Sequence, residues 1–272
     1  MSEPFLTVTS GTGTPVVLLP GGAATSHGYF PMLSDALVGR PVICFDRPGT
    51  GLQQDSGLAT LPGGSAALAD VLDQLGHPRV VLVGHSLGGA LAVQFAADYP
   101  DRVAGMVLLD PTPINDAMIC RWLPPLFKVL ASPGYVPVIG ARLSAGIFST
   151  LGKRVGPLEP AAQQSLTVLL TSADLAVTTK AVRTLPAEGA ALTPRLEPVG
   201  VPVVLVGADR KQNHRVRIAH EALAGLIGAE VQIWPGTAHA LHLQRPREVS
   251  ALVCKVADEA DRPDPSPTAR RQ

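Results

Sequence analysis

The alternation of short apolar runs with helical patterns constrains the fold more than any other feature of the chain. Six runs are continuous rather than alternating in polarity: residues 16–19, 42–45, 80–83, 106–109, 203–206 and 231–234. Continuous apolar runs of this length are typical of strands buried on both faces of a sheet. Residues 5–9 are a weaker candidate for a further strand.

Amphipathic helical patterns lie between several of these runs. Apolar residues recur at helical spacing in four stripes, which begin at Leu68, Leu87, Val216 and Val249. Strands that alternate with helices favour a mainly parallel sheet with right-handed crossover connections. We therefore expect the α/β class, with a mainly parallel central sheet and helices on both of its faces.

The alternation stops between the fourth and the fifth run. Residues 111–200 are rich in apolar side chains but contain no strong strand, and the segment is too long for a structureless loop. This predicts a helical insertion at 111–200 in a core formed by residues 1–110 and 201–260. Residues 261–272 are polar and rich in proline, which predicts a disordered tail.

Composition and charge exclude several classes of protein. Lys+Arg and Asp+Glu both number 22, so the basic excess expected of a nucleic-acid-binding protein is missing. The most apolar stretch, residues 123–151, is broken by charged residues and prolines, so we expect no stable membrane insertion. Cys44, Cys120 and Cys254 lack the spacing of a disulfide framework or a metal site, and no signal-peptide pattern is visible. We therefore expect free thiols, no metal and a cytoplasmic location.

The strongest local signal is Gly84-His85-Ser86-Leu87-Gly88, which fits G-x-S-x-G between an expected strand and an expected helix. A sharp turn at this junction lifts a serine hydroxyl above the sheet, and glycines on either side let the strand and the helix approach closely. A plain glycine-rich turn with a capping serine is the structural alternative. A phosphate-binding loop does not fit, because Ala90 stands where the lysine of that motif would follow Gly89.

With this motif in place, residues 5–257 resemble the α/β-hydrolase superfamily, in particular its esterases and lipases. The resemblance implies that Ser86 is a nucleophile. It also implies that the N–H groups of Gly22 and Leu87 form an oxyanion hole, although Pro20 stands where the family usually has histidine. The loop 46–51 resembles a family segment that supports the floor of the site. The insertion at 111–200 corresponds to the family's cap, or lid.

Residues 235–243 resemble the family's histidine loop, which implies that His239 is the general base. His242 is the competing histidine, but at i+3 it should turn into the following segment.

Two carboxylates compete for the third position. The family usually places its acid just after the strand that corresponds to residues 203–206, and Asp209 is the nearest carboxylate, with Arg210 at the usual place. We prefer Asp209. The alternative is Asp110, at the end of the preceding strand, a position that some lipase-like members use.

These residues predict a serine hydrolase that needs no cofactor and cleaves the carboxylic ester of a small, largely hydrophobic substrate through an acyl-enzyme on Ser86. The same residues would also serve a thioester, a lactone or a carbon–carbon bond. A ligand-binding relative without activity is the remaining alternative, and its mark would be a broken triad or oxyanion loop.

Overall fold

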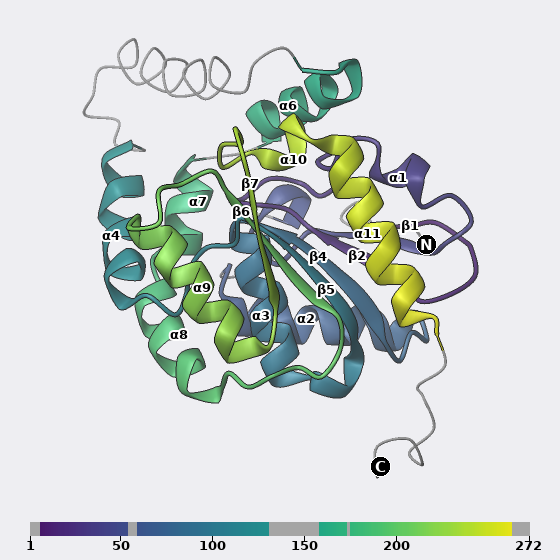
Figure 1. Cartoon of the computed structure of the whole chain (residues 1–272), viewed down its shortest axis with the longest axis horizontal. Coiled ribbons are helices and arrows are strands. Elements are labelled where there is room, and N and C mark those ends of the chain that lie inside the picture. Colours follow the sequence, from purple (N-terminus) through teal and green to yellow (C-terminus); the bar gives the residue numbers. More distant parts are fainter. Residues whose placement is uncertain (1–5, 54–58, 131–157, 173–174, 263–272) are drawn as a thin grey trace.

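The computed structural model describes residues 6–53, 59–130, 158–172 and 175–262. Its centre is a seven-stranded sheet in the order β1-β3-β2-β4-β5-β6-β7 (Figure 1). The strands are β1 (Leu6–Val8), β2 (Val16–Leu19), β3 (Val42–Phe45), β4 (Val80–His85), β5 (Val103–Leu109), β6 (Val203–Ala208) and β7 (Glu230–Trp234). The strand β1 pairs antiparallel with β3, and all other neighbouring strands are parallel.

Helices cover both faces of this sheet because successive side chains of each buried strand point to opposite faces. On one face Val17, Leu19 and Leu82 pack with the helices α2 (Leu61–Gln74), α3 (Leu87–Asp98) and α9 (Arg215–Ile227). On the other face Val16 and Val83 pack with α1 (Leu33–Ala36) and α11 (Pro246–Ala260), the yellow helix that crosses the sheet in Figure 1. The fold class expected from the sequence is confirmed.

The described part of the 111–200 insertion is helical. It contains α4 (Ala117–Leu130), α6 (Pro160–Ser172), α7 (Leu175–Val182) and α8 (Leu185–Leu192). The helix α4 packs against α7 and α8, while α6 contacts the short α10 (Leu241–Gln244). The described residues also form three 3-10 turns: Gly51–Gln53, Pro100–Arg102 and Thr193–Arg195. Residues 131–157 of the insertion and 263–272 of the expected tail lie outside the described residues.

All six apolar runs form strands, and the weaker candidate at residues 5–9 contains β1. Several strands extend beyond the apolar runs, and two of these extensions shape the site. The strand β4 continues to His85, so the turn begins directly at Ser86, and β6 continues to Ala208, so Asp209 already lies beyond the strand. In the described part of the chain, no helix has both the length and the apolarity that a membrane crossing requires.

Candidate active site

Ser86 occupies a strained turn between β4 and α3. Its backbone has φ 53° and ψ −116°, a conformation that costs energy for a residue with a side chain. A Cβ on Gly84 would come within 2.5 Å of the Gly88 carbonyl oxygen, and one on Gly88 would overlap the Leu19 carbonyl oxygen. Both glycines are therefore required by the close approach of strand and helix, as the motif predicts.

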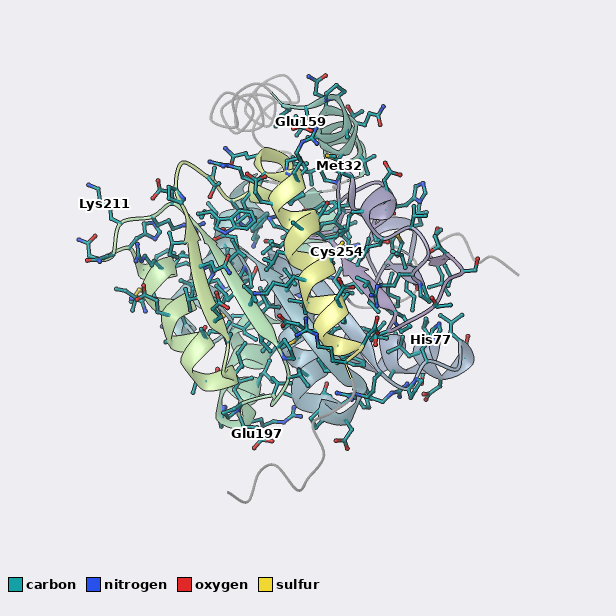
Figure 2. The ribbon with its side chains drawn as sticks, turned by 45° about the vertical axis from the view of Figure 1, so that its right-hand side comes forward. Met32, His77, Glu159, Glu197, Lys211 and Cys254 are labelled. Atoms are coloured by element: carbon teal, nitrogen blue, oxygen red, sulfur yellow. The ribbon has the colours of Figure 1, made fainter. Side chains whose placement is uncertain are left out.

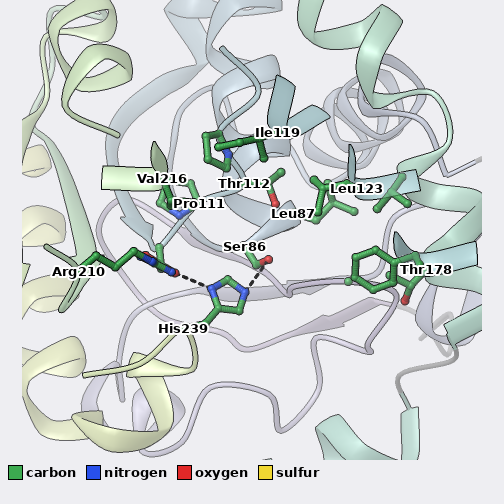
Figure 3. A pocket seen from close by; sticks show the side chains of 15 residues that line it. Ser86, Leu87, Pro111, Thr112, Ile119, Leu123, Thr178, Arg210, Val216 and His239 are labelled. Carbon is green, nitrogen blue, oxygen red and sulfur yellow. Dashed lines mark hydrogen bonds and ion pairs between the residues drawn. The ribbon is translucent and has the colours of Figure 1, made fainter. Parts of the chain in front are cut away.

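His239 lies beside Ser86, in the loop between β7 and α10. Its Nε2 is 3.1 Å from Ser86 Oγ, and its Nδ1 is 2.6 Å from Asp110 Oδ2 (Figure 3). The Asp110 carboxylate only accepts when ionised, so the imidazole hydrogen resides on Nδ1 and Nε2 is left to accept the serine proton. These three side chains have the geometry of a Ser-His-Asp triad.

Asp110 is held in place by its backbone and by four donors. Its φ of 43° lies in the left-handed region, and its side chain is 1% exposed. Besides His239, the donors are the Ala208 N–H at 3.0 Å and two guanidinium nitrogens of Arg210 at 2.5 and 2.6 Å. Burial by itself would raise the pKa of Asp110, but hydrogen bonds and charge from Arg210 and His239 outweigh it and hold that pKa well below its usual range.

The structure contradicts the preference for Asp209 as the carboxylate that meets His239. Asp209 is exposed, and its Oδ2 accepts the Gly236 N–H at 2.8 Å, so it fastens the loop that carries His239 instead of orienting the imidazole. The physical reason is the order of the strands. The strand β5 lies between β4 and β6, so the side chain at its end is the nearer one to Ser86. The alternative that the sequence left open, Asp110, is the carboxylate that meets His239.

Gly22 and Leu87 line the same cavity as Ser86 and His239. Leu87 is the first residue of α3, where a backbone N–H has no acceptor within the helix and attracts negative charge. Gly22 has φ 57°, and the Arg47 guanidinium donates to its carbonyl at 2.6 Å. Arg47 comes from the segment 46–51, so this loop does support the backbone of the site.

The cavity above Ser86 measures about 200 Å³ and is walled mainly by apolar side chains. Two helices of the insertion contribute to it. They supply Ile119, Leu123 and Phe127 from α4, and Thr178 and Val182 from α7. Figure 3 shows Leu123 and Thr178 on the side of Ser86 away from Arg210. This volume is below that of pockets for drug-sized ligands.

A chain of hydrogen bonds behind the triad joins the loop after β2 to the loop of His239 through the end of β4, and sequence reasoning missed it. The distance from His85 Nε2 to the His239 carbonyl oxygen is 2.9 Å, and that from His85 Nδ1 to Tyr29 Oη is 2.7 Å. A carbonyl only accepts, so His85 donates from Nε2 and receives the Tyr29 hydroxyl at Nδ1. The Gly21 N–H in turn donates to Tyr29. The available signal in the sequence was His85, which lies between the first glycine and the serine of G-x-S-x-G, but its partner Tyr29 belongs to no motif.

His242, the competing histidine, is buried and does not face Ser86. Its ring stacks on Tyr29 with centroids 4.9 Å apart, and neither ring nitrogen has a hydrogen-bond partner among the described residues. Burial, helped by the charges of His85 and His239, holds the pKa of His242 well below its usual value. The described residues contain no group of three or more His, Cys, Asp or Glu side chains that could hold a metal ion.

The fold agrees with the comparison to known sequences. The profile of the Alpha/beta hydrolase family matches residues 16–252, and the chain belongs to this family. Lipase LipV of Mycobacterium tuberculosis is 37% identical over 133 residues, which cover 48% of this chain and 50% of that protein. The 2-hydroxy-6-oxo-6-phenylhexa-2,4-dienoate hydrolase of Comamonas testosteroni is 31% identical over 140 residues, which cover 46% of this chain and 48% of that protein. The chain thus spans about half the length of the curated relatives it matches.

Among solved structures, MenH from S. aureus superposes with a TM-score of 0.75 over 96% of this chain and 100% of that chain. The sequence identity is 19%, so this likeness concerns the fold.

Proposed function

We propose that this protein is a serine hydrolase that cleaves carboxylic esters of small, largely hydrophobic substrates. The observation that carries the proposal is the continuous chain of contacts from Ser86 through His239 to Asp110, at the floor of an apolar cavity. A ligand-binding relative without activity would have no need of this alignment. The lipase among the relatives agrees with an ester as the substrate.

The geometry supports a two-step mechanism. Ser86 Oγ attacks the ester carbonyl while His239 Nε2 takes its proton, and the ionised Asp110 stabilises the imidazolium that forms. The N–H groups of Gly22 and Leu87 receive the oxyanion, and a donor of this kind typically contributes about 3–4 kcal/mol to the transition state. His239 then protonates the departing alcohol. A water molecule, deprotonated by the same imidazole, releases the acid from Ser86.

The cavity supports the choice of substrate. Its apolar walls favour a hydrophobic acyl or alcohol group, and its size of about 200 Å³ favours a short one. The partner of the protein is therefore a small molecule in this proposal. The three cysteines are free thiols, which supports our placing the protein in the reducing cytoplasm.

A second candidate is hydrolysis of a carbon–carbon bond next to a carbonyl. The Comamonas testosteroni relative carries a dienoate hydrolase name, and the same triad would serve such a bond. A substrate of that type carries a carboxylate. Among the described residues that line this cavity, Arg210 alone represents the lysines and arginines, and it already binds Asp110 with two nitrogens. Ester cleavage therefore remains the better fit.

The test is labelling with a fluorophosphonate probe, followed by peptide mapping and assays with p-nitrophenyl esters of two to twelve acyl carbons. We expect the label on Ser86 and turnover that is greatest for the short chains. The Ser86→Ala variant should fold normally, take up no label and lose several powers of ten in kcat. Ser65→Ala, in the buried part of α2, is the matched control and should keep both properties. Equal labelling of Ser86→Ala and wild type would contradict the proposal.

A further inference from the structure

Arg210 stands where the family usually has its acid, and its side chain points back into the site. Two of its guanidinium nitrogens lie 2.5 Å from Asp110 Oδ1 and 2.6 Å from Asp110 Oδ2. The Arg210 side chain is 18% exposed, and Figure 3 shows it directed toward the His239 ring. The neighbouring Lys211 projects outward at the edge of the molecule instead (Figure 2).

This ion pair changes the carboxylate on which His239 depends. The planar guanidinium matches both oxygens of a carboxylate, so two parallel hydrogen bonds fix the plane of the Asp110 group. One of these oxygens, Oδ2, is also the acceptor for His239 Nδ1. Arg210 therefore shares the negative charge that would otherwise act on the imidazole alone.

We propose that Arg210 is a positioning residue that fixes the Asp110 carboxylate and weakens proton binding by the Asp110–His239 pair. The inference rests on the proposed serine hydrolase function. A positive charge beside the pair opposes its protonation, whichever of the two side chains takes the proton.

The other titratable groups around the pair do not supply this charge. Burial lowers the pKa of His85, on β4, to about 3, and the pKa values of His242, on α10, and His220, on α9, are also lowered mainly by burial. Burial thus opposes a positive charge on each of these three imidazoles. The remaining charged neighbours act through the backbone: Asp209 accepts the Gly236 N–H, and Arg217, on α9, donates to the Arg210 carbonyl and pairs with Glu221.

The experiment compares two variants. Arg210→Met removes both the charge and the pair of parallel hydrogen bonds, whereas Arg210→Lys keeps the charge and removes the paired hydrogen bonds. In Arg210→Met we expect the acid limb of the kcat/KM profile to shift to higher pH by roughly one unit, which is the size of effect expected when a neighbouring charge is lost. In Arg210→Lys the limb should stay close to that of wild type. The plateau of kcat should fall severalfold in Arg210→Lys with little change in KM, because the carboxylate is less well fixed.

Two control variants separate this role from a general effect of charge or folding. Lys211→Met removes a neighbouring positive charge that faces solvent, and Arg215→Met breaks another arginine–aspartate pair, with Asp116, outside the cavity. Both should keep the wild-type profile. If Arg210→Met does not fold, Arg210→Gln takes its place, since it also lacks the charge.

A second readout, the NMR titration of the His239 imidazole without substrate, tests Arg210 independently of turnover. If the wild type cleaves none of the esters but the titration midpoint rises in Arg210→Met, the proposed function fails and the inference about Arg210 stands. An unchanged midpoint and an unchanged acid limb in Arg210→Met would overturn the inference. A shift in Arg210→Lys as large as that in Arg210→Met would overturn the role of charge.

Discussion

At the scale of single residues, the site depends on two backbones held in unfavourable conformations. Ser86 and Asp110 both have positive φ, and each directly follows a buried strand. The Asp110 N–H donates to the Val206 carbonyl at 2.7 Å, and the Ser86 N–H donates to the Leu109 carbonyl at 3.1 Å. These hydrogen bonds to neighbouring strands thus keep both backbones in the strained conformations that direct the two side chains toward His239.

The two candidate acids give a direct prediction. Asp110→Asn should lower kcat by roughly 10³–10⁴, because the amide no longer stabilises the imidazolium or fixes its tautomer. Asp209→Asn should cost less than about tenfold, since Asp209 only fastens the loop of His239 through the Gly236 N–H. Steady-state kinetics on one p-nitrophenyl ester decide the matter. A larger loss in Asp209→Asn than in Asp110→Asn would show that the contact geometry misassigns the acid.

The hydrogen-bond chain through Tyr29 predicts a second residue-scale effect. Tyr29→Phe leaves the buried Nδ1 of His85 without its donor, which should cost about 1–2 kcal/mol of unfolding free energy. Because His85 holds the carbonyl of His239, kcat should also fall by about tenfold with KM nearly unchanged. Tyr99→Phe makes the same change at the far end of α3, where Tyr99 packs on Phe95, and should leave kcat unaltered. Equal kcat values in the two variants would argue against a positioning role.

At the scale of elements, α4 has two apolar faces with different surroundings. Ile119, Leu123 and Phe127 line the cavity over Ser86, whereas Trp122 and Leu126 are 66% and 53% exposed. The spacing of the first set at i, i+4 and i+8 keeps it on one side of the helix. The described helices of the insertion thus contribute to the cavity wall through a single stripe of α4 together with α7.

This arrangement predicts that the inner stripe sets the length of the acyl chain. Leu123→Ala enlarges the cavity and should move the preferred p-nitrophenyl ester toward longer chains by several carbons, with activity on acetate changed less than about threefold. Leu126→Ala makes the same substitution on the exposed stripe and should preserve the chain-length profile. A uniform loss over all esters in Leu123→Ala, in step with lost stability, would instead assign Leu123 to the packing of the insertion.

At the scale of the whole molecule, buried neutral histidines couple the stability of the fold to pH. The pKa of His85 is lowered to about 3, and that of His242 lies well below its usual value, in both cases mainly by burial. Below about pH 6.5 the unfolded chain therefore binds protons that the folded protein refuses, and stability falls as pH falls. Each such histidine costs up to about 1.4 kcal/mol per pH unit. Asp110, whose pKa is lowered, adds to the loss only below about pH 4.

Urea unfolding between about pH 7 and pH 5 tests this coupling. The His242→Phe variant keeps the stack on Tyr29 and removes two ring nitrogens that have no partner among the described residues. At neutral pH its free energy of unfolding should be about 1–2 kcal/mol higher than that of wild type, and it should lose less stability on acidification. His27→Phe makes the same change at an exposed position and should keep the wild-type slope. A slope in His242→Phe as steep as in wild type would contradict this account.

The sequence by itself determined the strands of the sheet, the tight turn at Ser86 and the histidine of the site, because each depends on local pattern. Continuous apolar runs specify buried strands, the glycines around Ser86 specify a tight turn, and the loop after β7 carries His239 in a resemblance to known members. The tertiary structure decided the acid. The choice between Asp110 and Asp209 depends on which strand lies next to β4 and on a left-handed backbone at Asp110, and neither property is visible in local spacing. The Arg210 contact with Asp110 joins positions 100 residues apart, and Tyr29 meets His85 across 56, so only the packed sheet brings these groups together.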